Sequence, residues 1–507
     1  MVSGKLNRIP AIDEVVCQAK LAMEEHDFEL ALRLISKTMF RAFEVSMRRQ
    51  ILCFGSPELD DLCACLGKEL WPRMGGAENP CRLTDEEGVW DIYVASDLYD
   101  SGGHTPLIGD YIRAASHRRA FLLVTDIDNR LGEVGAPILD YIGLSSSQVA
   151  LCPETDLLNK FVWLKNMISR FVPNRVFLFN HPHDSVAVAA CAALTVADVF
   201  FIHHVDRSPC LGAYLKSAIH VDVTPFCYHC CRDKARISGN IFIPLVAKDE
   251  GKRCLSKGRL QSRGLVTATA GTEHKFRLDY TPNYISVIAE LLRVGGRRHV
   301  HIGHLSSSFL DRFRSQLREV GAVEDRFTYI PHVSSLWRAM ADFDVDLYIG
   351  SFPARGARAS VEVMGSGTPA VWHVSTNETW FHDTHMKYPE AATWRTKREL
   401  LGIADSTDDD WVLAQSRAAR RHYEANHNPE LMAEQLSASA VSGRLMHSDA
   451  AHFQMPTLKS FNELRNSTCF ATLDKTAAIS AGKLKADETR HSVLRRLFAG
   501  FTGKSKV

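Results

Sequence analysis

The sequence predicts an α/β protein made of two successive domains, each built on a parallel sheet. Short apolar runs alternate with helical stretches from residue 89 onward, and a second series of the same kind begins at residue 265. This strand–helix–strand rhythm is typical of parallel sheets, which bind ligands at the carboxyl ends of their strands. Residues 248–262 are basic, polar and poor in apolar side chains, so we expect them to connect the two domains.

Length and composition fit an ordinary globular protein. The chain has 507 residues, too many for one hydrophobic core, with 45% hydrophobic and 23% charged residues and a net charge of +1. Bulk charge of this size gives no indication of nucleic-acid binding, and we expect none. The thirteen cysteines follow no disulfide-framework spacing, and residues 1–15 do not resemble a signal peptide. We therefore expect a cytoplasmic protein with free thiols.

The amino-terminal region, residues 1–86, is predicted to be helical. Apolar side chains recur at helical spacing through residues 12–52. Residues 19–39 resemble a single tetratricopeptide helix pair, but one copy of that repeat cannot bury its own apolar face. We therefore favour a helical cap packed on the rest of the protein over a partner-binding arm.

The first α/β domain is assigned to residues 87–247. Its strands are expected at residues 90–96, 120–125, 175–180 and 198–203, with helices at 107–116, 157–171 and 185–193. The apolar run 186–202 is nearly long enough to span a membrane, but Asp198 interrupts it and alanine dominates its first half. A buried helix followed by a buried strand fits this run better.

The second α/β domain is assigned to residues 263–436. Its strands are expected at residues 265–270, 299–302, 327–330, 345–349 and 369–373. Residues 437–507 lose the alternating rhythm and form a carboxyl-terminal extension, in which residues 488–501 have a basic amphipathic pattern. Such a helix either docks on the protein, which we favour, or makes peripheral contact with the inner face of a membrane.

Residues 344–373 carry the most informative functional pattern. A buried strand is followed by a turn of small residues, a helix start, a Gly-x-Pro break and a second buried strand. A helix that begins near Gly356 would offer free backbone N–H groups as far as Ser360 to the phosphates of a nucleotide. Glu362, one turn further on, would accept a hydrogen bond from a ribose hydroxyl. The pattern predicts a nucleotide-sugar site and therefore glycosyl transfer.

These same residues carry a family resemblance. Phe352-Pro353, Gly356, an acidic residue at 362, Gly367 and Pro369 resemble the UDP-sugar loop of the O-linked N-acetylglucosamine transferase and bacterial adhesin N-glucosyltransferase group. Residues 267–282 are similar to that family's strand-to-helix segment. The polar turn residues of the family are replaced here by alanine, arginine and alanine, and its aspartate by glutamate.

The resemblance implies the GT-B fold, with two Rossmann-like domains facing a cleft, and UDP-sugar as co-substrate without a further cofactor. It makes Lys275 the lysine that contacts the diphosphate, and it places His332 and Ser334 against the base or phosphate. Ala354 stands where retaining enzymes of this fold have a glutamate, so we expect inversion at the anomeric carbon. The expected donor-binding residues are Lys275, His332, Ser334, Phe352, Gly356, Ala357, Arg358, Ala359, Ser360 and Glu362.

The loop between the first strand and helix of the first domain is expected to contribute to the acceptor side. Gly102 and Gly103 allow positive φ and a close approach of substrate, and Thr105 follows in the same loop. His104 would lie at the cleft, where a histidine suits the role of the base that deprotonates the acceptor. The alternative is that His104 only caps the helix through local hydrogen bonds.

A second polar cluster, His203, His204 and Asp206, follows a predicted strand at the same edge of the sheet. It would bind the acceptor, orient His104 or supply the base itself. Adjacent residues of a strand point to opposite faces, so only one of the two histidines can face the cleft. The polar residues after the preceding strand, 180–184, belong to the same rim.

No metal site is expected. The cysteines at 227, 230 and 231 resemble half of a zinc site, but no second Cys/His pair follows at a suitable spacing. Two Asp-x-Asp pairs, at 126–128 and 344–346, resemble the metal-binding pair of GT-A transferases. The second pair precedes a strand instead of following one, and the first lies in the acceptor half.

The leading hypothesis is therefore a metal-independent GT-B glycosyltransferase that uses a UDP-sugar and a protein or glycan acceptor. A nucleotide-sugar 2-epimerase of the same fold is an alternative within the enzyme class. A catalytically silent nucleotide-binding protein, supported by Ala354 and by the altered turn residues, is an alternative from another class.

Overall fold

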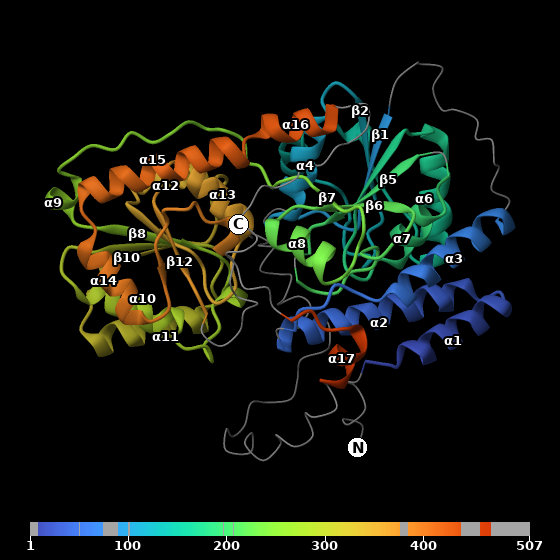
Figure 1. Ribbon diagram of the computed structural model, residues 1–507, viewed down its shortest axis with the longest axis horizontal. Coiled ribbons are helices and arrows are strands. Elements are labelled where there is room, and N and C mark those ends of the chain that lie inside the picture. Colours follow the sequence, from blue (N-terminus) through green and yellow to red (C-terminus); the bar gives the residue numbers. More distant parts are fainter. Residues whose placement is uncertain are drawn as a thin grey trace, which may run out of the picture. The chain divides into compact units, whose positions relative to one another are not determined.

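The computed structural model describes residues 9–49, 51–74, 90–99, 102–195, 197–205, 207–375, 384–437 and 457–467. The chain divides into two compact units (Figure 1). Unit 1 contains the described residues up to 243 together with 433–437 and 457–467, and unit 2 contains those from 244 to 432. The predicted amphipathic stretch 488–501 and the candidate residue Asp206 lie outside the described residues.

Unit 1 is built on a seven-stranded parallel sheet with the strand order β3-β2-β1-β4-β5-β6-β7. The second strand lies on one side of β1 and the fourth on the other, so the chain reverses direction across the sheet between β1 and β4. Such a switch point opens a crevice at the carboxyl ends of its two strands. The strands are β1 (Trp90–Ala95), β2 (Arg119–Val124), β3 (Val149–Leu151), β4 (Arg175–Phe179), β5 (Asp198–His203), β6 (Ala218–Asp222) and β7 (Ile241–Phe242).

Helices connect these strands and cover the sheet. They are α4 (His104–Ala114), α5 (Ala136–Ile142), α6 (Leu157–Phe171), α7 (Ser185–Ala192) and α8 (Pro225–Asp233). Every residue of α7 is buried and β5 follows it, which confirms the prediction for the apolar run 186–202. Among the residues that the structure describes, no helix is both long and apolar enough to cross a bilayer.

The amino-terminal helices share one hydrophobic core with the first sheet, as the helical-cap interpretation expects. They are α1 (Ile12–Glu24), α2 (Phe28–Arg49) and α3 (Pro57–Arg73), and α17 (Phe461–Asn466) packs on α2. Helix α3 packs on α7, and α2 packs on both α6 and α7. The buried carboxylate of Asp60 accepts hydrogen bonds from the backbone N–H groups of Gly212 (2.7 Å) and Tyr214 (2.8 Å), which joins α3 to the loop after β5.

Unit 2 is built on a six-stranded parallel sheet with the order β10-β9-β8-β11-β12-β13. Its switch point lies between β8 and β11, because β9 extends the sheet on one side and β12 on the other. The strands are β8 (Val266–Ala270), β9 (Arg298–Ile302), β10 (Phe327–Ile330), β11 (Leu347–Ile349), β12 (Ala370–His373) and β13 (Thr393–Trp394).

Two layers of helices enclose this second sheet. Figure 1 shows α10, α11 and α14 on one face and α12, α13 and α15 on the other. The bounds are α9 (Arg259–Arg263), α10 (Tyr284–Arg293), α11 (Ser307–Val320), α12 (Leu336–Asp342), α13 (Ala357–Gly365), α14 (Lys397–Ser406), α15 (Asp409–Asn426) and α16 (Pro429–Ser437). The nine predicted strands of the two domains are all present, with ends that differ by at most two residues.

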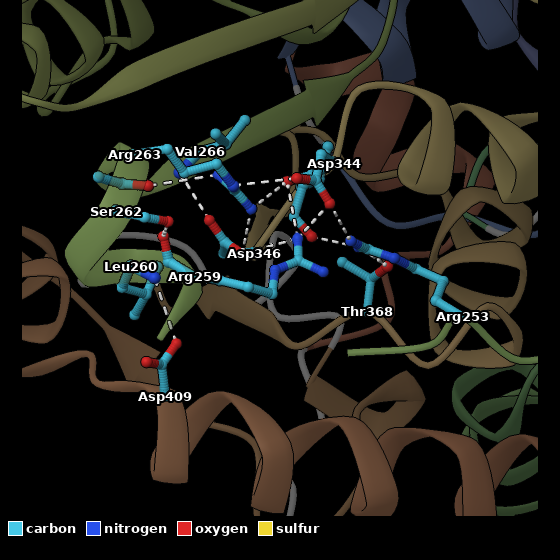
Figure 2. Close-up of polar contacts among 12 residues, drawn as sticks. Arg253, Arg259, Leu260, Ser262, Arg263, Val266, Asp344, Asp346, Thr368 and Asp409 are labelled. Atoms are coloured by element: carbon cyan, nitrogen blue, oxygen red, sulfur yellow. Dashed lines mark hydrogen bonds and ion pairs between the residues drawn. The ribbon is translucent and has the colours of Figure 1, made fainter. Parts of the chain in front are cut away.

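An arginine–aspartate cluster fastens the predicted connector to unit 2. Figure 2 shows Arg253, Arg259 and Arg263 around Asp344 and Asp346. Nη2 of Arg263 lies 2.8 Å from Oδ1 of Asp346, and Oδ2 of this carboxylate accepts a hydrogen bond of 2.9 Å from the backbone N–H of the first residue of β8. This Asp-x-Asp pair is thus neutralised by guanidinium groups at the amino end of β11, opposite the edge where parallel sheets bind ligands.

The cluster predicts a large and local effect on stability. Asp346 is 1% exposed, so Asp346→Ala removes the buried carboxylate that Arg259 and Arg263 share and leaves the first N–H of β8 without its acceptor; it should destabilise unit 2 by about 3–5 kcal/mol. Asp311→Ala removes an exposed ion pair on α11 and should cost less than about 1 kcal/mol. Hydrogen exchange of the β8 and β11 amides measures both effects; equal protection in the two variants would contradict this account of the cluster.

Candidate functional site

The switch point of unit 2 brings Lys275 to the start of helix α13. Lys275 ends a short 3-10 turn, Glu273–Lys275, that follows β8, and Gly356 is the N-cap residue of α13 after β11. The Nζ atom of Lys275 lies only 2.7 Å from the position that a Cβ atom on Gly356 would occupy. The backbone N–H of Ala354 donates to the carbonyl of Lys275 (3.4 Å), so the two loops are joined directly. Two predicted donor-site elements therefore meet.

The environment of these groups suits an anion. Burial without a counter-charge lowers the pKa of Lys275 to about 8, and within the described ranges no hydrogen bond or ion pair engages its ammonium group. Helix α13 has no side chain that caps its N-terminus. The backbone N–H groups of Ala357, Arg358 and Ala359 in its first turn have no partner within the helix. An ammonium group and a positive helix end thus lie side by side.

Glu362 lies one turn further along α13 and is positioned by Arg358. Nε of Arg358 donates to Oε1 of Glu362 over 3.1 Å, and Nη1 of the same arginine donates to the carbonyl of Val246 over 3.2 Å. Both side chains are mostly buried, with 13% and 18% exposed. Arg358 replaces a polar turn residue of the resembling family, and here it holds the carboxylate in place.

The other predicted donor residues divide into supporting and distant positions. Ser360 is buried and its hydroxyl donates to the carbonyl of Gly356 over 3.2 Å, while Phe352 is fully buried against Trp394, so both shape the turn from within. His332 and Ser334 are exposed and follow β10. Strand β9 lies between β10 and β8, so these residues follow a strand that lies two strand spacings, about 10 Å, from β8. No described contact joins them to Lys275, and their contact with a nucleotide stays a prediction.

At the switch point of unit 1, the structure gathers three imidazole rings. His104 opens α4 after β1, His181 follows β4 and His204 follows β5. The ring centroid of His104 lies 5.4 Å from that of His181 and 4.6 Å from that of His204. Tyr99 stacks on His181, with its hydroxyl 3.1 Å from Nε2 of that histidine. We define these four residues as the histidine cluster.

The loop that carries His104 is shaped by the residues predicted beside it. Gly102 is exposed and has a φ of +99°, a conformation that glycine adopts without strain. Gly103 is the exposed N-cap residue of α4. The buried hydroxyl of Thr105 accepts a hydrogen bond of 2.7 Å from the backbone N–H of Tyr99, so it closes the loop on itself.

A backbone hydrogen bond fixes the tautomer of His104. Its Nε2 lies 3.1 Å from the carbonyl oxygen of Phe179, which can only accept, so Nε2 carries the hydrogen and Nδ1 carries the lone pair. Nδ1 is buried and has no hydrogen-bond partner among the described residues. Burial lowers the pKa of His104 to about 4, which keeps the ring neutral at physiological pH. This partner is far away in the sequence, whereas a purely local helix cap would bond within its own turn.

His203 and His204 point to different surroundings, as strand alternation predicts. His204 joins the histidine cluster, and its Nε2 lies 3.0 Å from the carbonyl of Asn180. His203 is fully buried, with Nδ1 3.0 Å from Oδ1 of Asp222. Of this pair, His204 is therefore the residue beside His104.

Sequence reasoning underrated two members of the cluster. His181 was recognised only as one of several polar residues on the rim, and Tyr99 was missed. Tyr99 lies in the same strand-to-helix loop as His104. Its aromatic hydroxyl in that loop is the signal by which the sequence could have identified it. His183, from the same rim, instead lies 3.1 Å from Asp128 and so holds the first Asp-x-Asp pair.

Solved structures of glycosyltransferases resemble this chain at low identity. A glycosyltransferase from Rickettsia africae is 12% identical with a TM-score of 0.51, over 69% of this chain and 97% of its own. HepE of Anabaena, in complex with UDP-glucose, is 14% identical with a TM-score of 0.51, over 68% and 98%. TarM is 8% identical with a TM-score of 0.51, over 70% and 99%.

No protein-family model matches the sequence, and neither does any curated protein. At the identities given above, likeness to the solved structures establishes the fold alone. The two parallel sheets, each wound around a central switch point, agree with it. The predicted architecture is confirmed: this chain has the two-domain α/β fold of the GT-B glycosyltransferases.

Proposed function

We propose that the protein is a glycosyltransferase that transfers a sugar from a UDP-linked donor to a protein or surface-polysaccharide acceptor. The observation that carries the proposal is the contact between Lys275 and the first turn of α13. A fold shared with a protein solved in complex with UDP-glucose supports uridine as the nucleoside. Free thiols at the described cysteines agree with a reducing compartment such as the cytoplasm.

The donor half of the mechanism follows from charge. The diphosphate binds the ammonium group of Lys275 and the N–H groups at the start of α13, while Glu362 accepts a hydrogen bond from the ribose. The leaving diphosphate gains negative charge as the glycosidic bond breaks. A cation fixed beside it stabilises the transition state more than the ground state, which is the requirement for catalysis. Lys275 supplies this charge without a metal ion.

The acceptor half centres on the lone pair of His104. Nδ1 takes the proton from the acceptor as its oxygen or nitrogen attacks the anomeric carbon in a single inverting displacement. Ala354 agrees with inversion, since no glutamate stands there to act as a nucleophile. Because Nδ1 is shielded from solvent, an acceptor that reaches it must displace a covering side chain. His204 and His181 are the neighbouring rings that would bind or orient the acceptor.

Calorimetric titration with UDP tests the donor site. Lys275→Ala and Glu362→Ala should each weaken binding about 10-fold to 100-fold, because each removes a hydrogen bond to which a charged group contributes. Lys257→Ala is the matched control, since Lys257 is exposed in the same unit and pairs with Asp410. Wild-type affinity in both site variants would contradict the assignment.

The pH dependence of UDP binding tests Lys275 separately. Only the protonated amine attracts the diphosphate, and its pKa in the free protein is lowered to about 8. The affinity for UDP should therefore fall as the pH rises through about 8. Lys275→Arg, which stays charged throughout this range, should make the profile flat. A wild-type profile that is already flat would be inconsistent with the lowered pKa.

Release of UDP from a panel of UDP-sugars and acceptors tests His104. His104→Ala should keep its affinity for UDP but lose turnover by about 100-fold to 10,000-fold, since the general base is gone. His117→Ala, an exposed residue after the other end of α4, should behave as wild type. Undiminished turnover in His104→Ala would exclude this base. Conversion of the UDP-sugar to its 2-epimer without an acceptor would show that the protein is an epimerase. Tight binding of UDP without turnover on any acceptor would show that it is a catalytically silent binding protein.

A further inference from the structure

A second group of chemically active side chains lies in the core of unit 1, apart from the histidine cluster. His203 ends β5, His220 and Asp222 lie on the neighbouring strand β6, and Cys231 lies on α8. All four are buried, and their donor atoms lie within 4.8 Å of one another. His203 is paired with Asp222 in the sheet register, and His220 is two residues earlier on the same face of β6. Helix α8 adds the thiol.

We propose that these four residues, which we call the β5–β6–α8 site, bind a structural zinc ion. The proposal reverses the expectation that the protein has no metal site. It concerns the integrity of unit 1 and is independent of the proposed transferase activity, in which no metal touches the diphosphate.

Four of the six distances between the donor atoms lie between 3.0 and 3.4 Å, close to the edges of a tetrahedron around zinc. Nδ1 of His203 lies 3.0 Å from Oδ1 of Asp222, 3.3 Å from Nε2 of His220 and 3.4 Å from Sγ of Cys231. Nε2 of His220 lies 3.2 Å from the same Asp222 oxygen. Zinc bonds of about 2.0–2.1 Å to nitrogen and about 2.3 Å to sulfur give tetrahedral edges of about 3.3–3.6 Å.

The hydrogen bonds around His220 favour a cation between these atoms. Nδ1 of His220 lies 3.0 Å from the carbonyl of Ala213, so it carries the hydrogen and leaves a lone pair on Nε2. That lone pair faces the Asp222 carboxylate, which in its ionised form is also only an acceptor. At 3.2 Å two acceptors repel each other unless a metal ion lies between them or they share the Nδ1 hydrogen of His203. The rival to zinc is therefore a metal-free hydrogen-bond network among the same side chains.

The surrounding contacts resemble those that support metal ligands. The carbonyl of Ala213 orients the His220 ring, and Oδ2 of Asp222 accepts a hydrogen bond of 2.7 Å from Nδ2 of Asn240. Outer contacts of this kind, from a carbonyl to a histidine ligand and from an amide to a carboxylate, fix the orientation of the ligands. The set is complete without solvent, as in structural zinc sites.

The choice of ion follows from the ligand types and from charge. A thiolate and two imidazoles suit zinc, whereas magnesium and calcium prefer oxygen ligands. Binding displaces the Cys231 proton to solvent, so a thiolate and a carboxylate together balance the two charges of Zn²⁺. The buried site is then neutral, which removes the cost of isolated charges in the core. The ion also fixes the backbone beside His204, because His203 precedes it directly.

Metal analysis of the full chain, expressed with zinc and purified without a metal-affinity step, tests the proposal. We expect one zinc ion per chain, and a lower melting temperature after chelation that recovers when zinc is restored. Cobalt substitution should give a thiolate charge-transfer band together with the intense visible absorption of a tetrahedral ion. A wild-type protein that contains no zinc and lacks the cobalt–thiolate band would overturn the site and leave the metal-free hydrogen-bond network.

Two variants and a control separate this site from adventitious binding. Cys231→Ala should remove the zinc and the cobalt–thiolate band. Asn240→Ala keeps all four ligands and should weaken zinc affinity, measured by competition with a chelator, about 10-fold to 100-fold. Cys230→Ala is the matched control, because Cys230 is equally buried on the same helix but lies outside the group. Equal loss of zinc from Cys230→Ala, or full zinc in Cys231→Ala, would exclude the site.

Discussion

The candidate donor site depends on one arrangement, the adjacency of β8 and β11 across a switch point. Because these strands pair directly, the loop after β8 must meet the loop after β11. The first loop carries the ammonium group of Lys275, and the second leads into α13, whose first N–H groups have no partner within the helix. Positive charge therefore lies at the edge where a parallel sheet binds ligands. A side chain at Gly356 would have to displace the end of the Lys275 side chain, so glycine keeps the ammonium group against the start of α13.

The same winding rule acts in unit 1, but with different chemistry. There the switch point lies between β1 and β4, and the loops at that edge carry imidazole rings in place of cations. Burial keeps the His104 ring neutral, and a backbone carbonyl decides which nitrogen holds the lone pair. One sheet edge therefore presents positive charge, and the other presents neutral imidazole rings.

The strands that sequence predicted correctly are those in which burial and apolar pattern agree, as in β4 and β5. Strand β6 was not predicted, because its residues, Ala-Ile-His-Val-Asp, form no continuous apolar run like those of the predicted strands. His220 and Asp222 are buried in the structure. The polar groups of His203 and Cys231 lie against them and offset the cost of burying their side chains. These partners are distant in sequence, so local periodicity could not reveal them.

A crystal structure of the UDP complex tests most directly whether pyrophosphate binds between Lys275 and the first turn of α13, as we propose. We expect phosphate oxygens in hydrogen-bond contact with Nζ of Lys275 and with the N–H groups of residues 357–359, and the ribose beside Glu362. A nucleotide bound at another edge of the sheet, or one with Lys275 turned away from its phosphates, would contradict the account.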